Sequence, residues 1–442
     1  MKKGEDLRKM SNSKIKVVEM FAGVGGFHLG LSRASSEFEI VWANQYEPSR
    51  KNQFAYDIYK SNFPETNISN EDIALVDKSG IPDMDLLVGG FPCQDYSVAS
   101  TDAKGIYGKK GVLWWEIKNV IEAKSPPFIL LENVDRLLSS PGVNSQQPGH
   151  DFGMILRTLS DLDYGVTWKM INAADYGFPQ RRRRTFIFAF RGDTALKKCI
   201  KEIITKGKMD VADFLKVMPP LSNSLKNAST KAVSQVDLTK YKKLSDFSDK
   251  FSVKKGFKNT GLMVDGQVFM SDYYPELVKP QTLRSIIQPN ETNESLYLSH
   301  EQEIKFKSLK SGFRTTKISK TGHEYPYGMG AIAFPDSLEK PARTMVTSEH
   351  TISRMSHVIK DPGNGRLRVI SPEEAEKINT FPIGWTDVEN ISLSNRYFVM
   401  GNALVVDLVK TIGVEIVKLI KNEYSTRDTG TYKITFCANI NK

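Results

Sequence analysis

The sequence predicts an α/β fold with a doubly wound, mostly parallel sheet, joined to a smaller, irregular part that contains short strands. Three observations support this prediction. Between residues 14 and 191, apolar runs of strand length alternate with amphipathic stretches of helix length. Such alternation is typical of a parallel sheet covered by helices on both faces. Lys-, Ser- and Asn-rich segments follow, and a strongly apolar, helix-length stretch returns at residues 403–421.

The expected elements of the first part follow one another along the chain. Each expected strand is a short apolar run, and each expected helix is longer and amphipathic. The strands are expected at residues 15–20, 38–43, 85–88, 128–131, 166–171 and 185–190. The helices are expected at residues 23–34, 49–60, 112–123 and 151–162. Beyond residue 192 we expect irregular structure with small strands near 262–264 and 267–269, and a helix that begins at Pro372.

Composition and charge limit the possible classes of protein. The 442 residues are 40% hydrophobic and 25% charged, as in ordinary globular proteins. No run approaches 18 apolar residues and the N-terminus lacks a signal-peptide core, so we expect no membrane association and a cytoplasmic protein. The three scattered cysteines suit a reducing cytosol. The net charge is +10, and residues 191–342 hold 25 Lys and Arg against 17 Asp and Glu, which suits a polyanionic partner.

One segment places a thiol where open α/β sheets bind ligands. The stretch Gly89-Gly90-Phe91-Pro92-Cys93-Gln94 follows the apolar strand at 85–88. Cys93 therefore lies on a tight turn at the carboxyl end of the sheet. No second cysteine is near enough for a C-x-x-C metal or redox pair, and no metal site is expected. Because a lone cysteine is more often an inert apolar residue, the neighbouring motifs decide its interpretation.

A glycine-rich turn predicts a cofactor site. The first strand leads into Phe21-Ala22-Gly23-Val24-Gly25-Gly26, and an apolar helix follows. Glycines permit close backbone approach, and the helix N-terminus offers free N–H groups. The spacing is G-x-G-G and lacks the full dinucleotide fingerprint G-x-G-x-x-G. A cofactor with a carboxylate and a nucleoside therefore fits as well as a dinucleotide.

Further motifs, taken in order, identify a family resemblance. Glu132-Asn133-Val134 ends another apolar run, and Gln180-x-Arg182-x-Arg184 precedes the strand at 185–190. Together with the glycine turn, Phe91-Pro92-Cys93-Gln94 and Gly401-Asn402, they resemble the ordered motifs of DNA cytosine-5 methyltransferases. The resemblance covers residues 15–191 and 341–421. It implies a Rossmann-like, S-adenosylmethionine-dependent methyltransferase domain whose last helix returns to the N-terminal sheet.

The resemblance also implies a division of the chain. The expected segments are a disordered tail at 1–13, a catalytic and cofactor-binding domain at 14–191, a target-recognition domain at 192–394, a returning helix at 395–422 and a C-terminal tail at 423–442. Residues 95–111 are expected to be a loop that closes over DNA. Arg343-Thr344 resembles the motif that closes the recognition region.

The chemistry of cytosine methylation assigns roles to four residues. A thiolate that adds to C6 of cytosine makes C5 nucleophilic, and Cys93 is the expected nucleophile. The resemblance gives Glu132 the N3/N4 edge, where it acts as a carboxylic acid, and gives Arg184 the O2 edge, where its planar fork donates hydrogen bonds. Arg182 is expected to support Cys93 and its loop. Arg181 and Arg183 are expected to alternate outward.

The implied cofactor is S-adenosyl-L-methionine. Gly23, Gly25 and Gly26 are expected beside its methionine part, Phe21 near the adenine, and Asp72 and Ile73 at the adenine edge. Pro92, Asn402 and Ala403 complete the expected contacts, although the family often has serine where Ala403 stands. A second departure is Gln45, which occupies the usual place of an acidic ribose ligand, with Tyr46 as the adenine neighbour. Either Gln45 makes a weaker contact or Glu47 reaches the ribose.

The expected function is methylation of a flipped-out cytosine in a specific double-stranded DNA site through a covalent adduct of Cys93 with C6. Two alternatives remain: a tRNA cytosine-5 methyltransferase with the same catalytic domain, and a catalytically inactive DNA-binding homologue. The first would carry a Cys-Phe-Thr signature that this chain lacks. A monomer in the bacterial cytosol, associated with the nucleoid, is expected, with a restriction endonuclease encoded nearby as a possible partner.

Overall fold

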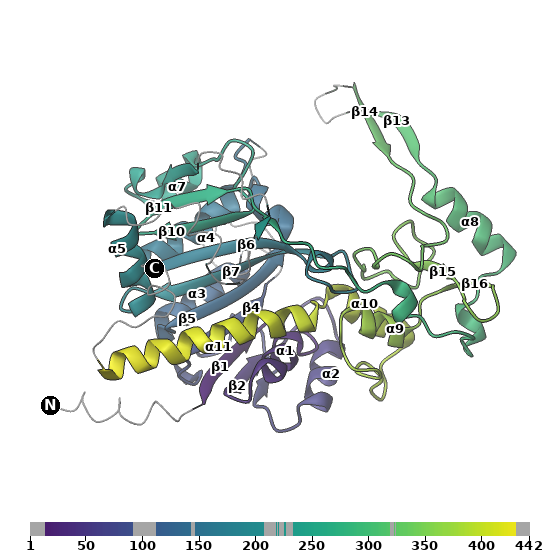
Figure 1. The fold of residues 1–442 in the computed structure, drawn as a ribbon, viewed down its shortest axis with the longest axis horizontal. Coiled ribbons are helices and arrows are strands. Elements are labelled where there is room, and N and C mark those ends of the chain that lie inside the picture. Colours follow the sequence, from purple (N-terminus) through teal and green to yellow (C-terminus); the bar gives the residue numbers. More distant parts are fainter. Residues whose placement is uncertain are drawn as a thin grey trace.

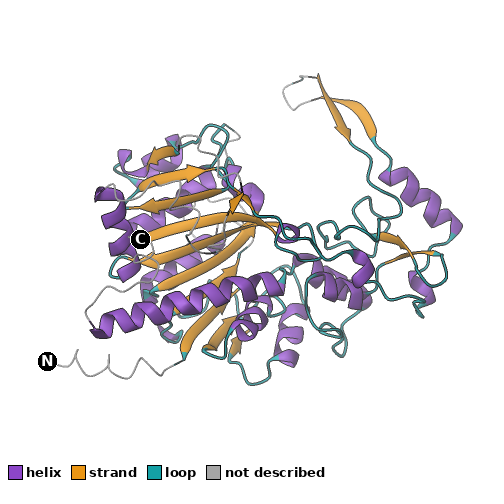
Figure 2. Cartoon of the chain, viewed as in Figure 1, coloured by secondary structure: helices purple, strands orange, loops and turns teal. Residues whose placement is uncertain are grey.

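The computed structural model describes residues 14–91, 112–142, 146–206, 218, 220, 225–226, 233–318, 322 and 324–429. These residues form a large body around a ten-stranded sheet and a smaller region beside it (Figure 1). Figure 2 shows the strands of the large body side by side with helices on both faces of the sheet. None of the helices in this part of the chain is long and apolar enough to cross a membrane.

Five neighbouring strands of the large sheet are parallel. Their order is β3 (Ile68–Ser69), β2 (Phe38–Asn44), β1 (Ile15–Met20), β4 (Leu86–Gly90) and β5 (Phe128–Val134). The helices of this half are α1 (Gly26–Ala34), α2 (Phe54–Asn62) and α3 (Val112–Lys124). The chain runs outward from β1 to β3 and then returns to place β4 on the other side of β1. The strand order therefore reverses between β1 and β4, and such switch points are where open α/β sheets bind ligands.

The other half of the sheet is antiparallel and extends further along the sequence than we expected. After β5 come β7 (Arg183–Arg191), β6 (Tyr164–Asn172), β10 (Thr260–Val264), β11 (Gln267–Ser271) and β9 (Ser234–Asp237). They are covered by α4 (His150–Asp161), α5 (Ala195–Lys206) and α7 (Leu244–Lys250).

The expected domain boundary at residue 192 does not coincide with a change of structural unit. Strand β10 pairs with β6, and its side chains are buried on both faces of the sheet. Gly261 makes this pairing possible, because a Cβ there would lie 2.1 Å from the Trp168 ring. The excess of basic side chains also lies mainly in the segment that contains these sheet strands. Residues 191–282 hold 17 Lys and Arg against 10 Asp and Glu, whereas residues 283–392 hold 14 of each.

The smaller region, residues 283–392, has a small apolar core of its own and a buried ion cluster, and it shares a larger apolar cluster with Val24, Ala55 and Val406 of the large body. Its elements are α8 (His300–Lys310), β13 (Phe313–Ile318), β14 (Glu324–Met329), β15 (Val358–Lys360), β16 (Leu367–Val369) and α9 (Pro372–Ile378). A two-stranded pair, β8 (Leu225–Lys226) with β12 (Tyr274–Pro275), precedes it. Arg368 is fully buried between Asp361 and Glu374, at 2.8 and 2.7 Å. This ion cluster ties β16 to the start of α9.

The last helices return the chain to the large body. Helix α10 (Leu393–Asn402) leads to α11 (Val406–Thr429), which crosses the sheet beside α1 (Figure 1). The crossing is close because each helix offers a glycine. A Cβ on Gly30 would lie 2.7 Å from Val409 Cβ, and one on Gly413 would lie 2.8 Å from Ala34 Cβ. The N-terminal and C-terminal segments therefore share one core.

Candidate active site

The expected site motifs meet at one edge of the sheet, on five neighbouring strands. Gln45 and Tyr46 follow β2, and Phe21 follows β1. Phe91 follows β4, Glu132 lies near the end of β5, and Arg184 lies at the start of β7. The register places Met20 opposite Gly89, Gly90 opposite Glu132, and Val134 opposite Arg184. Motifs far apart in the sequence are therefore adjacent in space.

The glycine turn after β1 packs against other side chains at Gly25 and Gly26, whereas its backbone at Gly23 is uncovered. Phe21 and Gly23 both have φ of +55°, and Gly25 has φ of +85°. A Cβ on Gly25 would lie 2.5 Å from the Phe63 ring, and one on Gly26 would lie 3.0 Å from Leu404, so both glycines are packed. A Cβ on Gly23 would meet nothing within 4 Å. The backbone at Gly23 is thus accessible to a ligand at the N-terminal end of α1.

Gln45 braces this turn. Its Oε1 accepts a hydrogen bond from the Gly23 N–H at 2.7 Å, and the residue is 6% exposed. The neighbouring Asn44 donates to the Glu71 carbonyl at 2.9 Å, which brings the Asp72-Ile73 segment to the end of β2. Ile73 is buried, and the Asp72 carboxylate accepts from the Ala74 N–H. Tyr46 is 36% exposed beside them. Expected adenosine contacts therefore surround the glycine turn.

Glu47, the alternative ribose ligand, contacts residues that are near it in the sequence. Its backbone N–H donates to Gln53, and its carboxylate lies 3.7 Å from the Arg50 guanidinium. Burial raises the pKa of Glu47, and the charge of Arg50 opposes this shift. Gln45, by contrast, contacts the glycine turn directly.

A buried polar chain beneath the turn was not anticipated from the sequence. Tyr59 OH lies 2.9 Å from His28 Nδ1 and 3.4 Å from Glu19 Oε2. Burial raises the pKa of Glu19 to about 8 and lowers the pKa of His28 to about 4. Tyr59 donates to Glu19 Oε2, and its hydroxyl oxygen can accept from the Nδ1–H of neutral His28, so one chain of hydrogen bonds joins the three residues. The only sequence signal was a Glu inside an apolar strand.

The cysteine turn begins beside the carboxylate motif. Pro92 and Cys93 lie outside the described residues, as does the loop at 95–111. Phe91 is the last residue before them; it is buried, and its carbonyl accepts a hydrogen bond from Asn133 Nδ2 at 2.8 Å. Asn133 therefore joins the end of β4 to the end of β5. The sequence placed Asn133 in a motif without assigning it this contact.

Glu132 and Arg184 form a close ion pair. Arg184 Nε lies 2.7 Å from Glu132 Oε1, and the two side chains are 17% and 12% exposed. The contact is an ion pair without aligned hydrogen-bond geometry at this oxygen. The missing side chain at Gly90 leaves room next to it, since a Cβ there would lie 3.2 Å from Glu132 Oε2. Arg181 and Arg183 are exposed, so the expected alternation is confirmed.

Arg182 is a buried brace. It is 1% exposed, and it donates to the Gly401 carbonyl at 3.0 Å and to the Met345 carbonyl at 3.3 Å. Its Nε has no partner among the described residues. Burial, and after it the charge of Arg184, lowers the pKa of Arg182, while the charge of Glu132 opposes this. Arg182 thus connects the arginine segment to two later segments of the chain.

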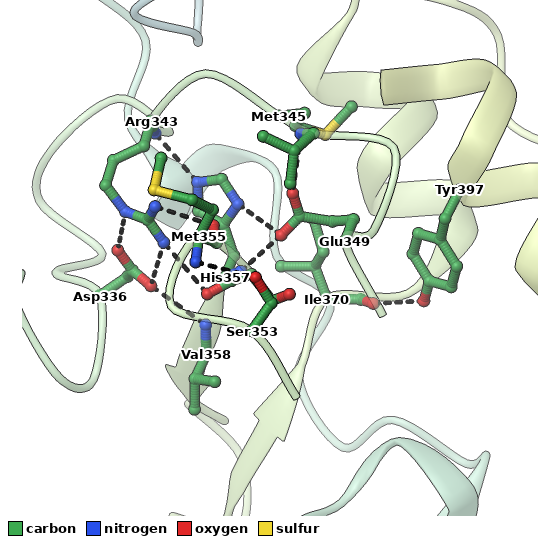
Figure 3. Close-up of polar contacts among 12 residues, drawn as sticks. Asp336, Arg343, Met345, Glu349, Ser353, Met355, His357, Val358, Ile370 and Tyr397 are labelled. Carbon is green, nitrogen blue, oxygen red and sulfur yellow. Dashed lines mark hydrogen bonds and ion pairs between the residues drawn. The ribbon is translucent and has the colours of Figure 1, made fainter. Parts of the chain in front are cut away.

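The segment around Arg343 packs against the arginine segment. Met345 N–H donates to Gln180 Oε1 at 3.1 Å, and Thr344 Oγ1 donates to the Arg181 carbonyl at 2.5 Å. Figure 3 shows the adjoining cluster, in which Arg343 Nε contacts Asp336 at 2.8 Å and its backbone N–H contacts His357. Burial acts to raise the pKa of Asp336, but the hydrogen bond from Arg343 and the surrounding cations lower it to about 2.

The Gly-Asn segment lies at the end of α10. A Cβ on Gly401 would lie 2.4 Å from Thr347 N, so this glycine permits close packing. Asn402 is exposed and Ala403 is half-buried. The following Leu404 reaches Gly26 of the glycine turn. No cluster of three or more potential metal-ligating side chains occurs in the described ranges.

The fold and the site define a class of protein. A glycine turn braced by Gln45 lies at the switch point of the sheet, next to the segments that follow β2, and the adjacent edge carries the Glu132–Arg184 ion pair. Residues 15–418 match the protein family described as C-5 cytosine-specific DNA methylase, and the chain belongs to this family. It is an S-adenosylmethionine-dependent DNA cytosine-5 methyltransferase.

Several known proteins are similar to this chain. The type II methyltransferase M.Sau3AI of Staphylococcus aureus is 44% identical over 413 residues, which cover 92% of this chain and 96% of the relative. M.HhaI of Haemophilus parahaemolyticus is 33% identical over 40% of this chain and 50% of its own length. A solved structure of a Spodoptera frugiperda DNMT2 mutant has a TM-score of 0.55 at 17% identity, covering 92% of this chain and 99% of that one, and shows the same fold.

Proposed function

We propose that Cys93 is the nucleophile and that Glu132 and Arg184 activate the target base. The flipped-out cytosine separates the Glu132–Arg184 ion pair, and Glu132 takes up a proton from solvent as it loses its cationic partner. The Cys93 thiolate then adds to C6 while Glu132, now a carboxylic acid, gives its proton to N3 and Arg184 donates to O2. The cofactor supplies an electrophilic methyl group to C5. Water or hydroxide removes the C5 proton, the Cys93–C6 bond breaks to release the thiolate, and N3 returns its proton to Glu132.

The observation that carries this proposal is the Glu132–Arg184 pair beside Gly90. It lies next to β4, the strand that leads to Cys93, and two strands from the glycine turn. An incoming cytosine offers N3 to one partner and O2 to the other, so it can replace their mutual contact with two contacts of its own. The carboxyl group and the guanidinium can therefore both hydrogen-bond the Watson–Crick edge of a flipped cytosine.

A trapping experiment tests the role of Cys93. DNA that contains 5-fluorocytosine should give a denaturation-resistant adduct with the intact enzyme, because fluorine cannot leave C5 as a cation. Cys93→Ser should give no adduct and no tritium transfer from labelled S-adenosylmethionine to DNA, while cofactor binding measured by calorimetry stays close to that of the native enzyme. Appreciable methylation by Cys93→Ser would contradict the covalent route.

For the cofactor we propose that Gly23, Gly25 and Gly26 face its methionine part and that Phe21, Tyr46, Asp72 and Ile73 surround the adenosine. Gln45 braces the turn and presents its amide towards the ribose in place of the usual carboxylate. Pro92, Asn402 and Ala403 complete the pocket. Gln45→Ala should weaken cofactor binding in calorimetry, whereas Glu47→Gln should leave it nearly unchanged; the reverse order would reassign the ribose contact to Glu47.

We propose that target recognition belongs to residues 283–392, a narrower range than the sequence suggested. The support is that β9, β10 and β11 belong to the catalytic sheet, whereas residues 283–392 form separate elements beside it. The substrate is double-stranded DNA. Replacing residues 283–392 with those of a relative of different specificity should transfer the relative's target sequence, as read by bisulfite sequencing.

We propose further that the enzyme is a cytosolic monomer of a restriction–modification pair. The support is that the relatives from Staphylococcus aureus and Haemophilus parahaemolyticus are named type II methyltransferases. Expression in a host followed by challenge with candidate endonucleases tests this pairing, since methylated host DNA should resist the cognate enzyme. Sedimentation of the purified enzyme with and without DNA tests the monomeric state.

A further inference from the structure

Gln180 and Asn379 form a buried pair of amide side chains that the proposed mechanism does not use. Both residues are fully buried, and Gln180 Nε2 donates to Asn379 Oδ1 at 2.6 Å across 199 positions of sequence. Gln180 precedes β7, the strand that carries Arg184, and Asn379 directly follows α9. The pair therefore joins the catalytic arginine segment to the end of the smaller region.

Backbone groups at both ends fix the orientation of the two amides. The Met345 N–H donates to Gln180 Oε1 at 3.1 Å, and Asn379 Nδ2 donates to the Met400 carbonyl at 2.8 Å. A backbone N–H can only donate and a carbonyl can only accept, so neither amide can turn over without losing a partner. Met345, Gln180, Asn379 and Met400 thus form one directed chain of hydrogen bonds, which we call the amide chain.

One end of the amide chain constrains the target-base site. Arg182 Nη1 lies 3.5 Å from Gln180 Oε1 and donates to the Met345 carbonyl at 3.3 Å. Strand β7 begins at the next residue, and Arg184 pairs there with Glu132. The position of Gln180 therefore sets where β7 starts, and with it the place of the guanidinium that we assign to the target base.

The other end is attached to the cofactor side of the molecule. The Asn379 carbonyl accepts from the Val406 N–H at 3.0 Å, and Thr380 Oγ1 accepts from the Asp407 N–H at 2.8 Å. The Thr380 carbonyl accepts from Arg33 Nη1 at 2.7 Å. Arg33 belongs to α1, the helix that starts at the glycine turn, and α11 starts at Val406 (Figure 1). Both helices are thus joined to the dipeptide Asn379–Thr380.

This dipeptide is a fixed connection. Thr380 has φ of +61°, which is uncommon for a β-branched residue and persists only where the surroundings hold it. Arg33 holds its carbonyl and Asp407 its hydroxyl, and Arg33 and Asp407 also pair with each other at 2.8 Å. Movement at Asn379 would therefore shift the cofactor side relative to β7.

We propose that Asn379 is a positioning residue that fixes the distance between the methyl donor and the target cytosine. It holds the start of β7 against the elements that carry the glycine turn. This inference rests on the proposed roles of Arg184 and of that turn. Methyl transfer needs close and aligned reacting atoms, and a misplacement of about 1 Å can cost about 100-fold in rate. Since Asn379 is fully buried, we expect it to contact neither DNA nor cofactor itself.

Single-turnover kinetics of Asn379→Leu test the proposal. The substrate is a duplex with the consensus that bisulfite sequencing gives for a random-sequence library methylated by the native enzyme. Leucine is close to asparagine in shape and makes no hydrogen bonds, so the rate constant should fall about 100-fold. Calorimetry with S-adenosylmethionine alone, and titration of the duplex, should give dissociation constants close to the native values.

Asn259→Leu is the matched control for this variant. The Asn259 amide makes two hydrogen bonds, both with the backbone of Tyr273 at 2.6 and 2.8 Å, in the antiparallel half of the molecule. Its loss should lower the thermal midpoint and leave the single-turnover rate constant unchanged. A merely structural role of Asn379 would give the same pattern in Asn379→Leu.

Gln180→Met tests whether the two amides act as one unit. Methionine is close to glutamine in shape, and the variant loses the same amide–amide hydrogen bond. The double variant with Asn379→Leu should then be no slower than the slower single variant. Fully additive losses in the logarithm of the rate constant would refute the amide chain.

Arg33→Gln is a milder variant that decides the question even if Asn379→Leu does not fold. It removes a half-buried side chain from Thr380, and the rate constant should fall about tenfold with cofactor binding preserved. Lys421→Gln is its control, because Lys421 pairs with Glu37 at 2.6 Å and so joins α11 to the segment before β2 without contacting the dipeptide. This variant should keep the native rate constant.

The outcomes separate the proposed function from the further inference. A native enzyme that methylates no cytosine in the library would refute the proposed function itself. With an active native enzyme, native rate constants in Asn379→Leu and Arg33→Gln would refute the positioning role alone. A fall in rate matched by an equal fall in affinity for cofactor or duplex would also refute it, because Asn379 would then serve binding. So would a fall in Asn259→Leu as large as in Asn379→Leu.

Discussion

Replacing Glu19 with Gln should change the pH dependence of stability. Glu19 is fully buried under the cofactor turn, and burial raises its pKa to about 8 from the ordinary value of 4.5. The folded state therefore holds a proton that the unfolded state releases near pH 4.5. The stability that this group contributes is fully present below pH 4.5 and is lost as the pH rises towards 8.

The expected magnitude follows from that difference in pKa. At about 1.4 kcal/mol per pKa unit, the loss is below about 1 kcal/mol at pH 5, about 3 kcal/mol at pH 7 and about 4 kcal/mol at pH 8. Gln is neutral at every pH, and its amide oxygen can accept the hydrogen bond that Tyr59 donates to Glu19. Glu19→Gln should thus resemble the native enzyme at pH 5 and exceed its stability at pH 8.

Urea denaturation at pH 5, 6, 7 and 8 measures this effect. The midpoint of Glu19→Gln should move above the native midpoint by roughly 1 M at pH 8 and by much less at pH 5. The exposed Glu39 on neighbouring β2 is the control, because Glu39→Gln should show no pH-dependent difference. His28 acts in the opposite direction: its pKa is lowered from 6.5 to about 4, so its contribution is lost as the pH falls below 6.5. Parallel native and Glu19→Gln profiles between pH 5 and 8 would refute the reasoning.

Three further predictions concern single contacts. Glu132→Gln should lower the single-turnover rate about 10²–10⁴-fold, because an amide cannot give a proton to N3; a native rate would remove Glu132 from the mechanism. Asn133→Ala should leave the Phe91 carbonyl unsatisfied, cost about 1–3 kcal/mol in a denaturation experiment and slow methyl transfer more than it weakens cofactor binding. Gly30→Ala should lower stability by about 1–3 kcal/mol, since its Cβ would lie 2.9 Å from the Val406 carbonyl oxygen; unchanged thermal unfolding would contradict the close helix crossing.

The sequence predicted the parallel half of the sheet because its signals are local. Each strand is a short apolar run followed by its motif, and the carboxyl ends of parallel strands meet at one edge. Phe21 and Glu132 could therefore be placed at one edge from the sequence. Arg184 was assigned to the site by the family resemblance, and it reaches this edge because β7 runs antiparallel to β5. The outward alternation of Arg181 and Arg183 followed from strand periodicity in the same way.

The rest depended on contacts between distant residues. The sequence predicted a small strand at 262–264, but the role of the preceding Gly261 beneath Trp168 becomes visible only because β10 joins the large sheet. Arg182 was expected to support Cys93, but two of its hydrogen bonds go to carbonyls more than 160 residues away. Local pattern does not encode such pairings, and for the same reason it did not show that β9, β10 and β11, which follow residue 192, join the large sheet.

The cofactor turn is completed by residues that the ribosome makes much later, since Trp385 follows Val24 by 361 positions. Trp385 donates to the Val24 carbonyl at 2.9 Å, Leu404 packs under Gly26, and Val409 packs on Gly30. At ordinary synthesis rates of about 5–20 residues per second, roughly 20–80 s separate the emergence of the turn from that of its supports. A nascent or prematurely terminated chain therefore carries the glycine motif without the residues that pack against it. We therefore expect no methylation activity from a chain that ends before Val409.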